Sequence, residues 1–500
     1  MRSSGESLQT SVYRELITLS KVNETYLRVD GSGGVRRELN EFFSFFAPGY
    51  KFMPAYRNKF WDGKIRLYNG NNNTIYLGLL PYIKAFCKDR DYDLEYDESL
   101  EFANECSIAE IEDFATTLNL PFKPHDYQVE AVAHCVRENR AMILSPTASG
   151  KSLIIYMLTQ IYRENKALLV VPTVSLVHQM AKDFKEYGYG EPCKLITAGV
   201  DKENIEENIT ITTWQSIYKM PKQWFDQFNL VIGDEAHLFK AKSLTSIMTK
   251  LTDCKYRFGF TGTLDGTETH KLVLEGLFGT VKSFVKTKDL IERGAVADLK
   301  IKILVLKYAE ETCKIVKDYK FQDEMDYIVR NDKRNKFIRN LVKSLDGNTL
   351  VLFQYVEKHG KILHDQIQQS LNNRKVFFVF GGTDAETRES VRSITEREND
   401  AIIIASYGTF STGINIKNLH NVVFASPSKS RIRNLQSIGR GLRKSETKEA
   451  MTLYDIADDF QYKKNVNYTL RHLYERVKIY NEEQFEYKIY KIKLEDVQNE

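Results

Sequence analysis

The segment at residues 145–152, SPTASGKS, constrains the fold of this 500-residue chain more than any other. An apolar run at 141–144 precedes it and a longer apolar run at 153–158 follows it, and we interpret these as a buried parallel strand and a helix. A strand, a loop and a helix in this order surround one point with backbone N–H groups and with the positive end of the helix. The segment therefore predicts a cradle for a polyphosphate.

The last two residues of the loop have separate tasks in such a cradle. Lys151 is placed to reach the β and γ phosphate oxygens, and the Ser152 hydroxyl is placed to bind Mg²⁺. One position departs from the G-x-x-x-x-G-K-[ST] pattern, because Ser145 stands where the first glycine belongs. We expect the other loop residues to contact the phosphates, and these are Pro146, Thr147, Ala148, Ser149 and Gly150.

Two further features fit hydrolysis of the bound nucleotide. A second apolar strand, at 230–233, ends in Asp234 and Glu235, which can hold Mg²⁺ through water and polarise the attacking water, respectively. Arg440 and Arg443 share one face of a predicted helix and would stabilise transition-state charge, an effect worth about 10³–10⁵ in rate. Each feature alone also fits an ordinary turn or surface stripe. The three in this order predict a nucleotide-hydrolysing enzyme.

With these features and several more, the chain resembles the superfamily 2 helicases and translocases over residues 122–458. Tyr127 and Gln128 resemble the adenine-reading Q motif, and the phosphate loop resembles motif I. Within the superfamily the chain is most similar to the UvsW-type helicases of T4-like phages, because a short aromatic and basic region around Trp61-Asp62-Gly63 precedes the motor. The other matches are 172–179 for motif Ia, 212–216 for Ic, 234–237 for II, 261–263 for III, 352–354 for IV, 411–415 for V and 436–443 for VI.

The resemblance implies ATP and Mg²⁺ as the cofactors and extends the nucleotide site. Ser152 and Asp234 are expected to hold the metal, and Gln128 to read the adenine. His125 and Asn415 depart from the Arg and Asp that are frequent in relatives. The residues that the resemblance implies for the site, besides the loop, are Gln128, Asp234, Glu235, Gly413, Asn415, Gln436, Arg440 and Arg443.

Strand ends elsewhere in the two halves carry residues suited to a nucleic-acid backbone. Pro172, Thr173 and Thr213 offer hydroxyl and N–H groups, and such contacts are largely blind to sequence. Gly381 and Gly382 would let a phosphate approach closely, although a plain loop explains them equally well. The expected backbone contacts are Pro172, Thr173, Thr213, Gln215, Gln354, Gly381, Gly382, Ser406 and Thr412, and the expected coupling residues are His237, Thr261 and Thr263.

Apolar strands alternate with helical stretches through most of the chain, which predicts parallel sheets with ligands at the strand carboxyl ends. The strands are 166–171, 209–213, 230–233 and 257–261 in the first half and 349–353, 376–379, 401–405 and 422–425 in the second. We predict an α/β protein with two tandem RecA-like motor lobes, the form that the resemblance implies, preceded by a small α+β domain. The predicted ranges are 1–112 for the N-terminal nucleic-acid-binding domain with an acidic connector, 113–295 and 296–460 for the lobes, and 461–500 for a helix and strand tail.

In the N-terminal domain, Asp62 and Gly63 predict the two-residue turn of a hairpin with strands at 56–61 and 64–68. This pairing sets Lys59 opposite Arg66, and folding alone does not favour opposed like charges, whereas a phosphate backbone would. We interpret the face as a nucleic-acid-binding surface, and a merely solvated face is the alternative. The face contains Arg57, Lys59, Trp61, Lys64, Arg66 and Tyr68, and the opposite face directs Phe60, Ile65 and Leu67 to the core.

The composition narrows the class of protein. The net charge is only +4, from 71 basic and 67 acidic residues, so local patches must attract any nucleic acid. The six cysteines are scattered without a C-x-x-C pair, which favours a reducing compartment without structural zinc or disulfides. The start of the chain has no signal-peptide pattern, and no stretch reaches the roughly 18 apolar residues of a membrane span. We expect a cytoplasmic protein, in the host cytoplasm if a phage encodes it.

These features predict an ATP-dependent nucleic-acid motor in which the arginines complete the site when the lobes close. The resemblance implies action on branched DNA, namely forks, displacement loops, RNA–DNA loops and four-way junctions, during recombination, repair and replication. We expect a monomer whose partners are single-stranded and branched duplex DNA, and RNA within hybrids. The alternatives are an RNA helicase, the motor of a restriction system, and an ATP-gated clamp or annealing factor that does not unwind.

Overall fold

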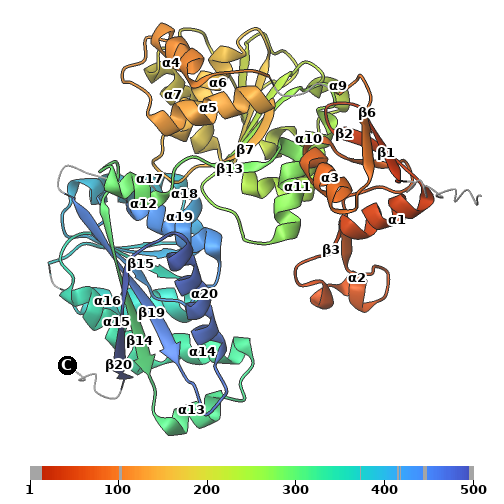
Figure 1. Cartoon of the computed structure of the whole chain (residues 1–500). Coiled ribbons are helices and arrows are strands. Elements are labelled where there is room, and N and C mark those ends of the chain that lie inside the picture. The colour runs from red at the N-terminus through yellow and green to blue at the C-terminus, as the bar shows by residue number, and fades with distance from the viewer. Residues whose placement is uncertain are drawn as a thin grey trace, which may run out of the picture. The chain divides into compact units, whose positions relative to one another are not determined.

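The computed structural model describes residues 14–100, 104–371, 373–413, 416, 418–442 and 448–494. The chain, coloured from its N-terminus to its C-terminus in Figure 1, divides into two compact units. The first unit comprises Met1–Leu144, Lys151–Thr261 and Gly266–Phe284, and the second comprises Ser145–Gly150, Gly262–Asp265 and Val285–Glu500.

The first unit begins with a four-stranded sheet in the order β5-β2-β1-β6. Strand β6 runs parallel to β1, and the other pairs are antiparallel. Helix α1 starts where the Ser32 side chain accepts a hydrogen bond from the N–H of Val35, and it buries Val35 and Leu39 in the core of this region. The elements are β1 (Leu16–Lys21), β2 (Tyr26–Asp30), α1 (Gly33–Phe42), β3 (Ser44–Phe46), η1 (Tyr50–Phe52), α2 (Pro54–Arg57), β4 (Lys64–Arg66), β5 (Thr74–Tyr76), η2 (Leu77–Leu79), α3 (Leu80–Asp89) and β6 (Asp93–Tyr96).

The rest of the first unit is a seven-stranded sheet in the order β13-β7-β12-β11-β8-β10-β9, and all its pairs are parallel. Its central strands are buried along their length, as expected for a sheet covered on both faces. The elements are α4 (Ile108–Thr117), α5 (Asp126–Glu138), β7 (Arg140–Leu144), α6 (Lys151–Ile161), β8 (Ala167–Val171), α7 (Val174–Glu186), β9 (Lys194–Ile196), β10 (Ile209–Thr213), α8 (Trp214–Ile217), α9 (Lys222–Phe225), β11 (Leu230–Asp234), η3 (Ala236–Lys240), α10 (Lys242–Lys250), β12 (Tyr256–Thr261), α11 (Glu268–Phe278) and β13 (Val281–Ser283).

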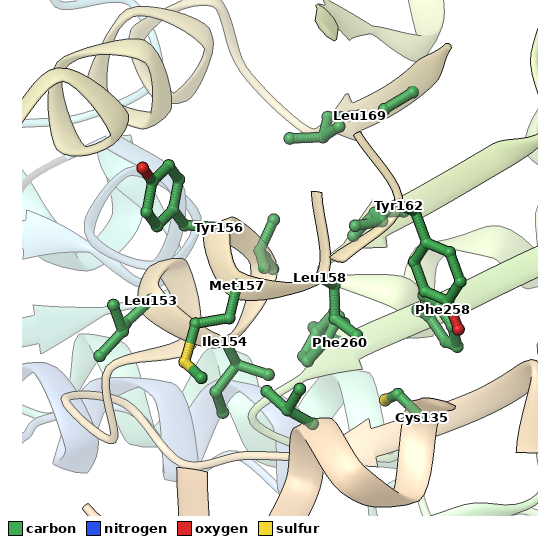
Figure 2. Packing of buried hydrophobic residues seen from close by; sticks show 14 of the residues in the cluster. Cys135, Leu153, Ile154, Tyr156, Met157, Leu158, Tyr162, Leu169, Phe258 and Phe260 are labelled. Atoms are coloured by element: carbon green, nitrogen blue, oxygen red, sulfur yellow. The ribbon is translucent and has the colours of Figure 1, made fainter. Parts of the chain in front are cut away.

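Helix α6, which follows the phosphate loop, is the centre of the core of this lobe. Its residues 153–158 are all at most 3% exposed, so the helix is apolar on every side, as buried helices are. Figure 2 shows Leu158 of α6 beside Phe260 of β12, with Ile154 and Met157 along the same helix and Cys135 of α5 nearby. The loop is therefore anchored to a helix whose residues 153–158 are buried on every side.

Buried polar contacts fix the N-terminal sheet to this lobe. Arg257 on β12 is fully buried and donates to Thr25 Oγ1 at 2.9 Å and to the carbonyl of Met248 at 3.2 Å. The Tyr82 hydroxyl donates to a carboxylate oxygen of Glu275 on α11 at 2.5 Å. Removing one partner of such a buried contact leaves an unsatisfied group, so the two parts of the first unit are held in one arrangement.

The second unit repeats the parallel architecture with a seven-stranded sheet in the order β16-β17-β15-β18-β19-β14-β20. Two fully buried ion pairs stabilise it, Arg334 with Asp458 and Arg476 with Asp455. The elements are α12 (Thr287–Glu292), β14 (Asp298–Lys307), α13 (Glu310–Val316), α14 (Phe321–Arg330), α15 (Asp332–Ser344), β15 (Thr349–Phe353), η4 (Val356–Gly360), α16 (Lys361–Gln369), β16 (Val376–Val379), α17 (Ala385–Arg397), β17 (Ile402–Ser406), α18 (Tyr407–Gly413), β18 (Asn421–Phe424), α19 (Arg431–Gly441), β19 (Ala450–Asp459), α20 (Tyr468–Glu482) and β20 (Tyr487–Lys493).

The predicted fold class is confirmed: two parallel α/β lobes follow a small α+β region. Strands β10, β15 and β16 have the predicted bounds, and the other five predicted strands lie within one residue of theirs at either end. A capping box starts helix α4, because Ser107 Oγ accepts from the N–H of Glu110 and a Glu110 oxygen accepts from the N–H of Ser107. Among the described residues, every helix is too short or too polar to cross a lipid bilayer.

The predicted hairpin at 56–68 is wrong. Strand β4 pairs with β3, not with residues 56–61, and its register sets Arg66 opposite Ser44 rather than opposite Lys59. The reason is local, because Pro54 occupies the first turn of α2, a position that suits proline. The expected strand is replaced by the end of this helix and by a turn in which Lys59 has a φ of 59°. Phe60 is 87% exposed, although it was expected in the core, whereas Leu67 is buried as predicted.

Candidate nucleotide and nucleic-acid site

The phosphate loop connects β7 with α6 and is closed by its own serines. Ala148 and Gly150 have φ values of 66° and 75°, the left-handed conformation found in anion-binding turns. Ser145 Oγ lies 2.5 Å from Ser149 Oγ, which donates to the carbonyl of Pro146 at 2.7 Å. Both serines are buried. The serine at the position of the usual first glycine thus gives the loop an internal hydrogen bond.

The lysine of the loop lies between the two carboxylates that follow β11. Lys151 Nζ is 4.0 Å from Asp234 Oδ1 and 3.9 Å from Glu235 Oε1. Glu235 has a φ of 50°, and this left-handed turn ends the strand. The structure therefore brings together the three residues to which the sequence assigned phosphate binding, metal binding and water activation.

The oxygen atoms around Lys151 suit Mg²⁺. Burial raises the pKa of the Asp234 carboxyl, and the neighbouring Lys151 ammonium opposes this shift. The described residues contain no group of three or more His, Cys, Asp or Glu side chains that could hold a metal. Mg²⁺ typically needs only one or two protein oxygens beside water and substrate phosphates, so the Ser152 hydroxyl and the Asp234 carboxylate fit this ion.

The residues predicted to couple hydrolysis to movement meet at the ends of adjacent strands. His237 Nδ1 lies 2.9 Å from Thr261 Oγ1, at the end of β12, and 3.3 Å from Glu235 Oε2. His237 and Thr261 are buried, and so is Thr263. Close contacts therefore connect the carboxylate assigned to water activation with Thr261, the first residue of the segment that resembles motif III.

The predicted adenine-reading residue has a fixed orientation. Gln128 is buried on α5, and its Oε1 accepts from the N–H of His125 at 2.8 Å. The His125 ring stacks on that of Tyr127 with a centroid distance of 5.3 Å. The start of α5 therefore presents an ordered surface in which His125, the residue that departs from the common arginine, is exposed.

The predicted nucleic-acid contacts of the first lobe differ in accessibility. Thr173 caps α7, because its Oγ1 accepts from the N–H of Leu176 at 3.4 Å. Thr213 is only 4% exposed and its Oγ1 lies 3.0 Å from that of Ser216, so its hydroxyl is already engaged inside the lobe. Gln215, two residues later, is exposed, as is required of a contact residue. Pro172 is half-buried at the end of β8.

The corresponding residues of the second lobe also follow strands. Gln354 is exposed after β15, and its backbone N–H donates to Ser426 Oγ at 3.1 Å. Gly381 and Gly382 are exposed after β16, which leaves both the phosphate-contact and the plain-loop interpretations open. Ser406 ends β17, and its Oγ lies 2.8 Å from Thr409 Oγ1.

Helix α19 carries the arginine and glutamine of the segment that resembles motif VI. Arg440 is half-buried, and its Nη1 donates to the carbonyl of Phe410 at 2.8 Å. Gly439 and Thr147 belong to the same compact unit. A Cβ atom on Gly439 would lie 2.8 Å from Thr147 Oγ1, which explains why this position is a glycine. Gln436 is half-buried on the same helix. Thr412 and Gly413 belong to α18, whereas Asn415 and Arg443 lie outside the described residues.

The N-terminal residues predicted to bind nucleic acid form an aromatic and basic tip rather than a sheet face. The tip consists of residues 44–66, and Figure 1 shows its elements β3 and α2 as an extension of the N-terminal region. Phe52 is 85% exposed and Phe60 87%. An open hollow of about 540 Å³ is lined by Tyr56, Arg57, Lys59, Phe60, Trp61 and Asp62.

Charges on the tip are not equivalent. Arg66 forms an ion pair with Asp62, and this hydrogen bond lowers the pKa of the Asp62 carboxyl to about 2. The Lys64 ammonium lies 5.3 Å from the centroid of the Phe46 ring, and Trp61 Nε1 donates to the carbonyl of Lys64 at 2.9 Å. Among the predicted contact residues of the tip, Arg66 is therefore the one whose positive charge is balanced by a carboxylate of the protein.

Two residues beside the predicted metal ligand belong to no motif in the sequence. Ser152 Oγ lies 2.8 Å from the hydroxyl of Tyr187, and the carboxylate of Asp183 also hydrogen-bonds the Ser152 side chain. Both belong to the helix α7 region, more than 30 positions along the chain. Only the spacing of 179, 183 and 187, at which residues share one helix face, signals this arrangement.

Three family models match successive parts of the chain. The model described as DNA helicase UvsW, N-terminal, covers residues 17–97. The model described as Type III restriction enzyme, res subunit, covers residues 121–266, and the Helicase conserved C-terminal domain covers residues 332–445. The matches therefore follow the order of the N-terminal region and the two lobes.

Individual proteins resemble the chain over most of its length. The ATP-dependent DNA helicase uvsW of Enterobacteria phage T4 is 37% identical over 489 residues, which are 93% of this chain and 97% of that protein. The DNA 3'-5' translocase XPB2 of Sulfurisphaera tokodaii is 25% identical over 66% of this chain and 80% of its own length. The crystal structure of T4 UvsW matches with a TM-score of 0.51 and 34% identity, over 96% of this chain and 99% of that one.

Proposed function

The chain belongs to the UvsW family of ATP-dependent DNA helicases, and on this basis we propose that it remodels branched DNA such as forks, displacement loops, RNA–DNA loops and four-way junctions. Recombination, repair and replication are the processes that produce these substrates. The observation that supports an active motor is the convergence of Lys151, Asp234 and Glu235 at the strand ends of the first lobe. A DNA-binding protein that no longer hydrolyses ATP would not need these three side chains close together.

In this proposal each residue of the first lobe has a defined task. Lys151 and the loop N–H groups bind the β and γ phosphates of ATP, and Gln128 orients the adenine. Ser152 and Asp234 would hold Mg²⁺, which would neutralise phosphate charge when bound. Glu235 accepts the proton of the attacking water.

The second lobe supplies positive charge to the same nucleotide. Arg440 and Arg443 stabilise the charge on the transferring phosphoryl group, and Gln436, Gly413 and Asn415 complete the site. Hydrolysis removes the group that both lobes hold, and His237, Thr261 and Thr263 pass this change to the strand contacts. The proposed contacts are Pro172, Thr173, Gln215, Gln354, Gly381, Gly382, Ser406 and Thr412, without the buried Thr213. Alternating grip of this kind moves the chain along one DNA strand.

The aromatic and basic tip gives the N-terminal region a role in choosing the substrate. Arg57, Lys59 and Lys64 contact phosphates, and the side chain of Trp61 supports the strand that carries Lys64. Because buried contacts fix this region to the first lobe, a duplex held at the tip would keep its position relative to the motor strand. A junction offers a duplex and a single strand together, so it suits a protein that binds a duplex at the tip and a single strand at the motor lobes.

A strand-separation assay tests the proposed function. The purified chain should separate a synthetic fork and migrate a four-way junction with ATP and Mg²⁺, and should do neither with a non-hydrolysable ATP analogue. An RNA duplex of equal length serves as the comparison, because the motifs alone do not distinguish RNA helicases. Preference for the RNA duplex would favour the RNA helicase, and ATP hydrolysis that DNA fails to stimulate would favour a clamp.

The tip is tested separately through salt dependence. Replacing Arg57, Lys59 and Lys64 together by Ala should weaken binding to forked DNA and reduce the slope of log affinity against log salt by about 2–3, since each lost phosphate contact removes about 0.9 from the slope. Arg66→Ala is the matched control and should change the slope by less than one of these replacements, because Asp62 already pairs with Arg66. An unaltered slope in the triple variant would show that the tip is only solvated.

A further inference from the structure

Helix α7 carries a polar stripe that ends at the predicted metal ligand. Gln179, Asp183 and Tyr187 are spaced four residues apart, so they share one side of the helix. Gln179 Nε2 donates to Asp183 Oδ1 at 2.7 Å, Asp183 hydrogen-bonds Ser152, and the Tyr187 hydroxyl lies 2.8 Å from Ser152 Oγ. The opposite side of the helix packs into the core through Val177, Met180 and Phe184.

The two partners on α7 favour one orientation of the Ser152 hydroxyl, because a hydroxyl has a limited hydrogen-bonding capacity. A hydroxyl has one hydrogen to donate and two lone pairs to accept with. An ionised Asp183 can only accept, so it takes the hydrogen of Ser152, while Tyr187 can donate to one lone pair. The second lone pair is then left for a cation, and its direction is fixed by the two partners on α7.

The other end of α7 is part of the predicted nucleic-acid track. Thr173, one of the expected backbone contacts, caps the helix, and Gln179 is the last residue of the segment that resembles motif Ia. The helix has 13 residues and is therefore about 20 Å long. A rigid element with a strand contact at its start and the partners of a metal ligand near its end connects the two sites directly.

We propose that Tyr187 and Asp183 are positioning residues for the Mg²⁺–nucleotide complex and that α7 transmits nucleic-acid binding to Ser152. This inference rests on the proposed function, in which Ser152 binds the metal. Binding of a strand at Thr173 shifts α7 along its axis and with it the partners of the Ser152 hydroxyl. By thermodynamic linkage, Mg²⁺ and nucleotide then strengthen strand binding by the same factor by which the strand strengthens theirs.

Packing alone does not require the hydroxyl of Tyr187. The ring of Tyr187 contacts the rings of Phe122 and Tyr156, with centroid distances of 5.8 Å and 5.5 Å, and Phe would preserve both contacts. Tyr189 offers a matched control, because its ring also contacts that of Tyr156 while its hydroxyl bonds Glu191. The two tyrosines thus share a location in the core but only one reaches Ser152.

The test compares Tyr187→Phe and Asp183→Asn with Tyr189→Phe and the parent chain. Equilibrium binding of a fluorescent ATP analogue is titrated with Mg²⁺, with and without single-stranded DNA, and thermal unfolding checks that each variant folds. Loss of a group that orients a metal ligand commonly costs 10–100-fold in metal affinity. We therefore expect the half-saturating Mg²⁺ concentration to rise about tenfold in Tyr187→Phe and in Asp183→Asn. In Tyr189→Phe it should stay within about twofold of the parent value. In Tyr187→Phe and Asp183→Asn, DNA should no longer change this concentration.

The outcomes separate this inference from the proposed function. If Tyr187→Phe and Tyr189→Phe bind nucleotide with the same Mg²⁺ dependence as the parent, or if the response to DNA survives in Asp183→Asn, the role of α7 is overturned. If the parent chain itself hydrolyses ATP without stimulation by DNA, the proposed function fails instead. A DNA-stimulated parent with a tenfold shift in the first two variants supports both.

Discussion

The two lobes have the same parallel sheet architecture, but their charged residues are used differently. In the first lobe, Lys151, Asp234 and Glu235 lie at the strand ends, with side chains 12–25% exposed. In the second lobe, the buried pairs Arg334–Asp458 and Arg476–Asp455 have side chains at most 1% exposed. Charges that must meet a ligand are thus kept partly accessible, and charges that hold helices onto the sheet are sealed.

This difference shows why similar sheets do not imply similar sites. Asp234 has a lysine at about 4 Å, a distance at which phosphate or metal can still enter. Asp458 instead receives hydrogen bonds from Arg334 at 2.7 and 3.0 Å and from the Tyr308 hydroxyl at 2.8 Å. Asp458 is fully buried behind these donors and cannot meet a ligand from solvent, so its contribution is to stability.

The largest expected effect concerns the first-lobe charges. Lys151→Ala removes the phosphate contact and Glu235→Gln removes the proton acceptor, so each should lower DNA-stimulated ATP hydrolysis by at least about 10³-fold. Binding of a fluorescently labelled fork, measured by anisotropy, should stay within a few fold of the parent chain. Turnover that persists in both variants would disprove the assignment of this site.

A buried pair of the second lobe should affect stability rather than turnover chemistry. Asp458→Asn leaves the Arg334 guanidinium buried without its counter-charge, which commonly costs about 3–5 kcal/mol. Denaturant unfolding followed by circular dichroism measures this loss, because the three tryptophans of the chain all lie in the first unit. A double replacement, Arg334→Met with Asp458→Leu, should recover most of it, and an equally unstable double variant would contradict a purely electrostatic cause.

Acidification should lower the unfolding free energy of both lobes through one largely desolvated histidine in each. Burial lowers the pKa of His134 on α5 and of His472 on α20 to about 4, whereas an unfolded histidine titrates near 6.5. The unfolded chain therefore binds more protons between these values, and the unfolding free energy falls as the pH drops from about 6.5 toward 4. Because both side chains are partly solvated, we expect each histidine to lower the unfolding free energy by about 1–2 kcal/mol at pH 4.5.

Single replacements test the contributions of His134 and His472 separately. His134→Gln and His472→Gln should each flatten the dependence of the denaturation midpoint on pH between 7 and 4.5, compared with the parent chain. Slopes in both variants that stay parallel to that of the parent chain would show that other groups dominate the acid response.

The sequence predicted the lobes well because their signals are local and redundant. A buried parallel strand such as β15 is a continuous apolar run, and each motif follows such a run, so strand and site support each other. The tip had one signal only, Asp62-Gly63. Gly63 does turn with φ of 82°, but which strand would pair with β4 depended on Pro54 and on contacts distant in sequence.

The partners of Ser152 were unpredictable for a related reason. A hydrogen bond between Ser152 and Tyr187 joins two helices, and neither residue lies in a pattern that names the other. Asp183 looked like an ordinary residue of an amphipathic helix. Long-range pairings of single side chains depend on how α6 and α7 pack, which composition and periodicity do not specify.

One measurement tests most directly whether both lobes act on one nucleotide. The rate of ATP hydrolysis by Arg440→Ala is determined at saturating ATP and fork DNA, together with its affinity for a fluorescent ATP analogue. A shared site predicts a fall in rate of about 10³-fold or more with nearly unchanged nucleotide affinity, because the arginine acts on transition-state charge. A rate equal to that of the parent chain would show that the first lobe hydrolyses ATP alone, and the proposed motor would be refuted.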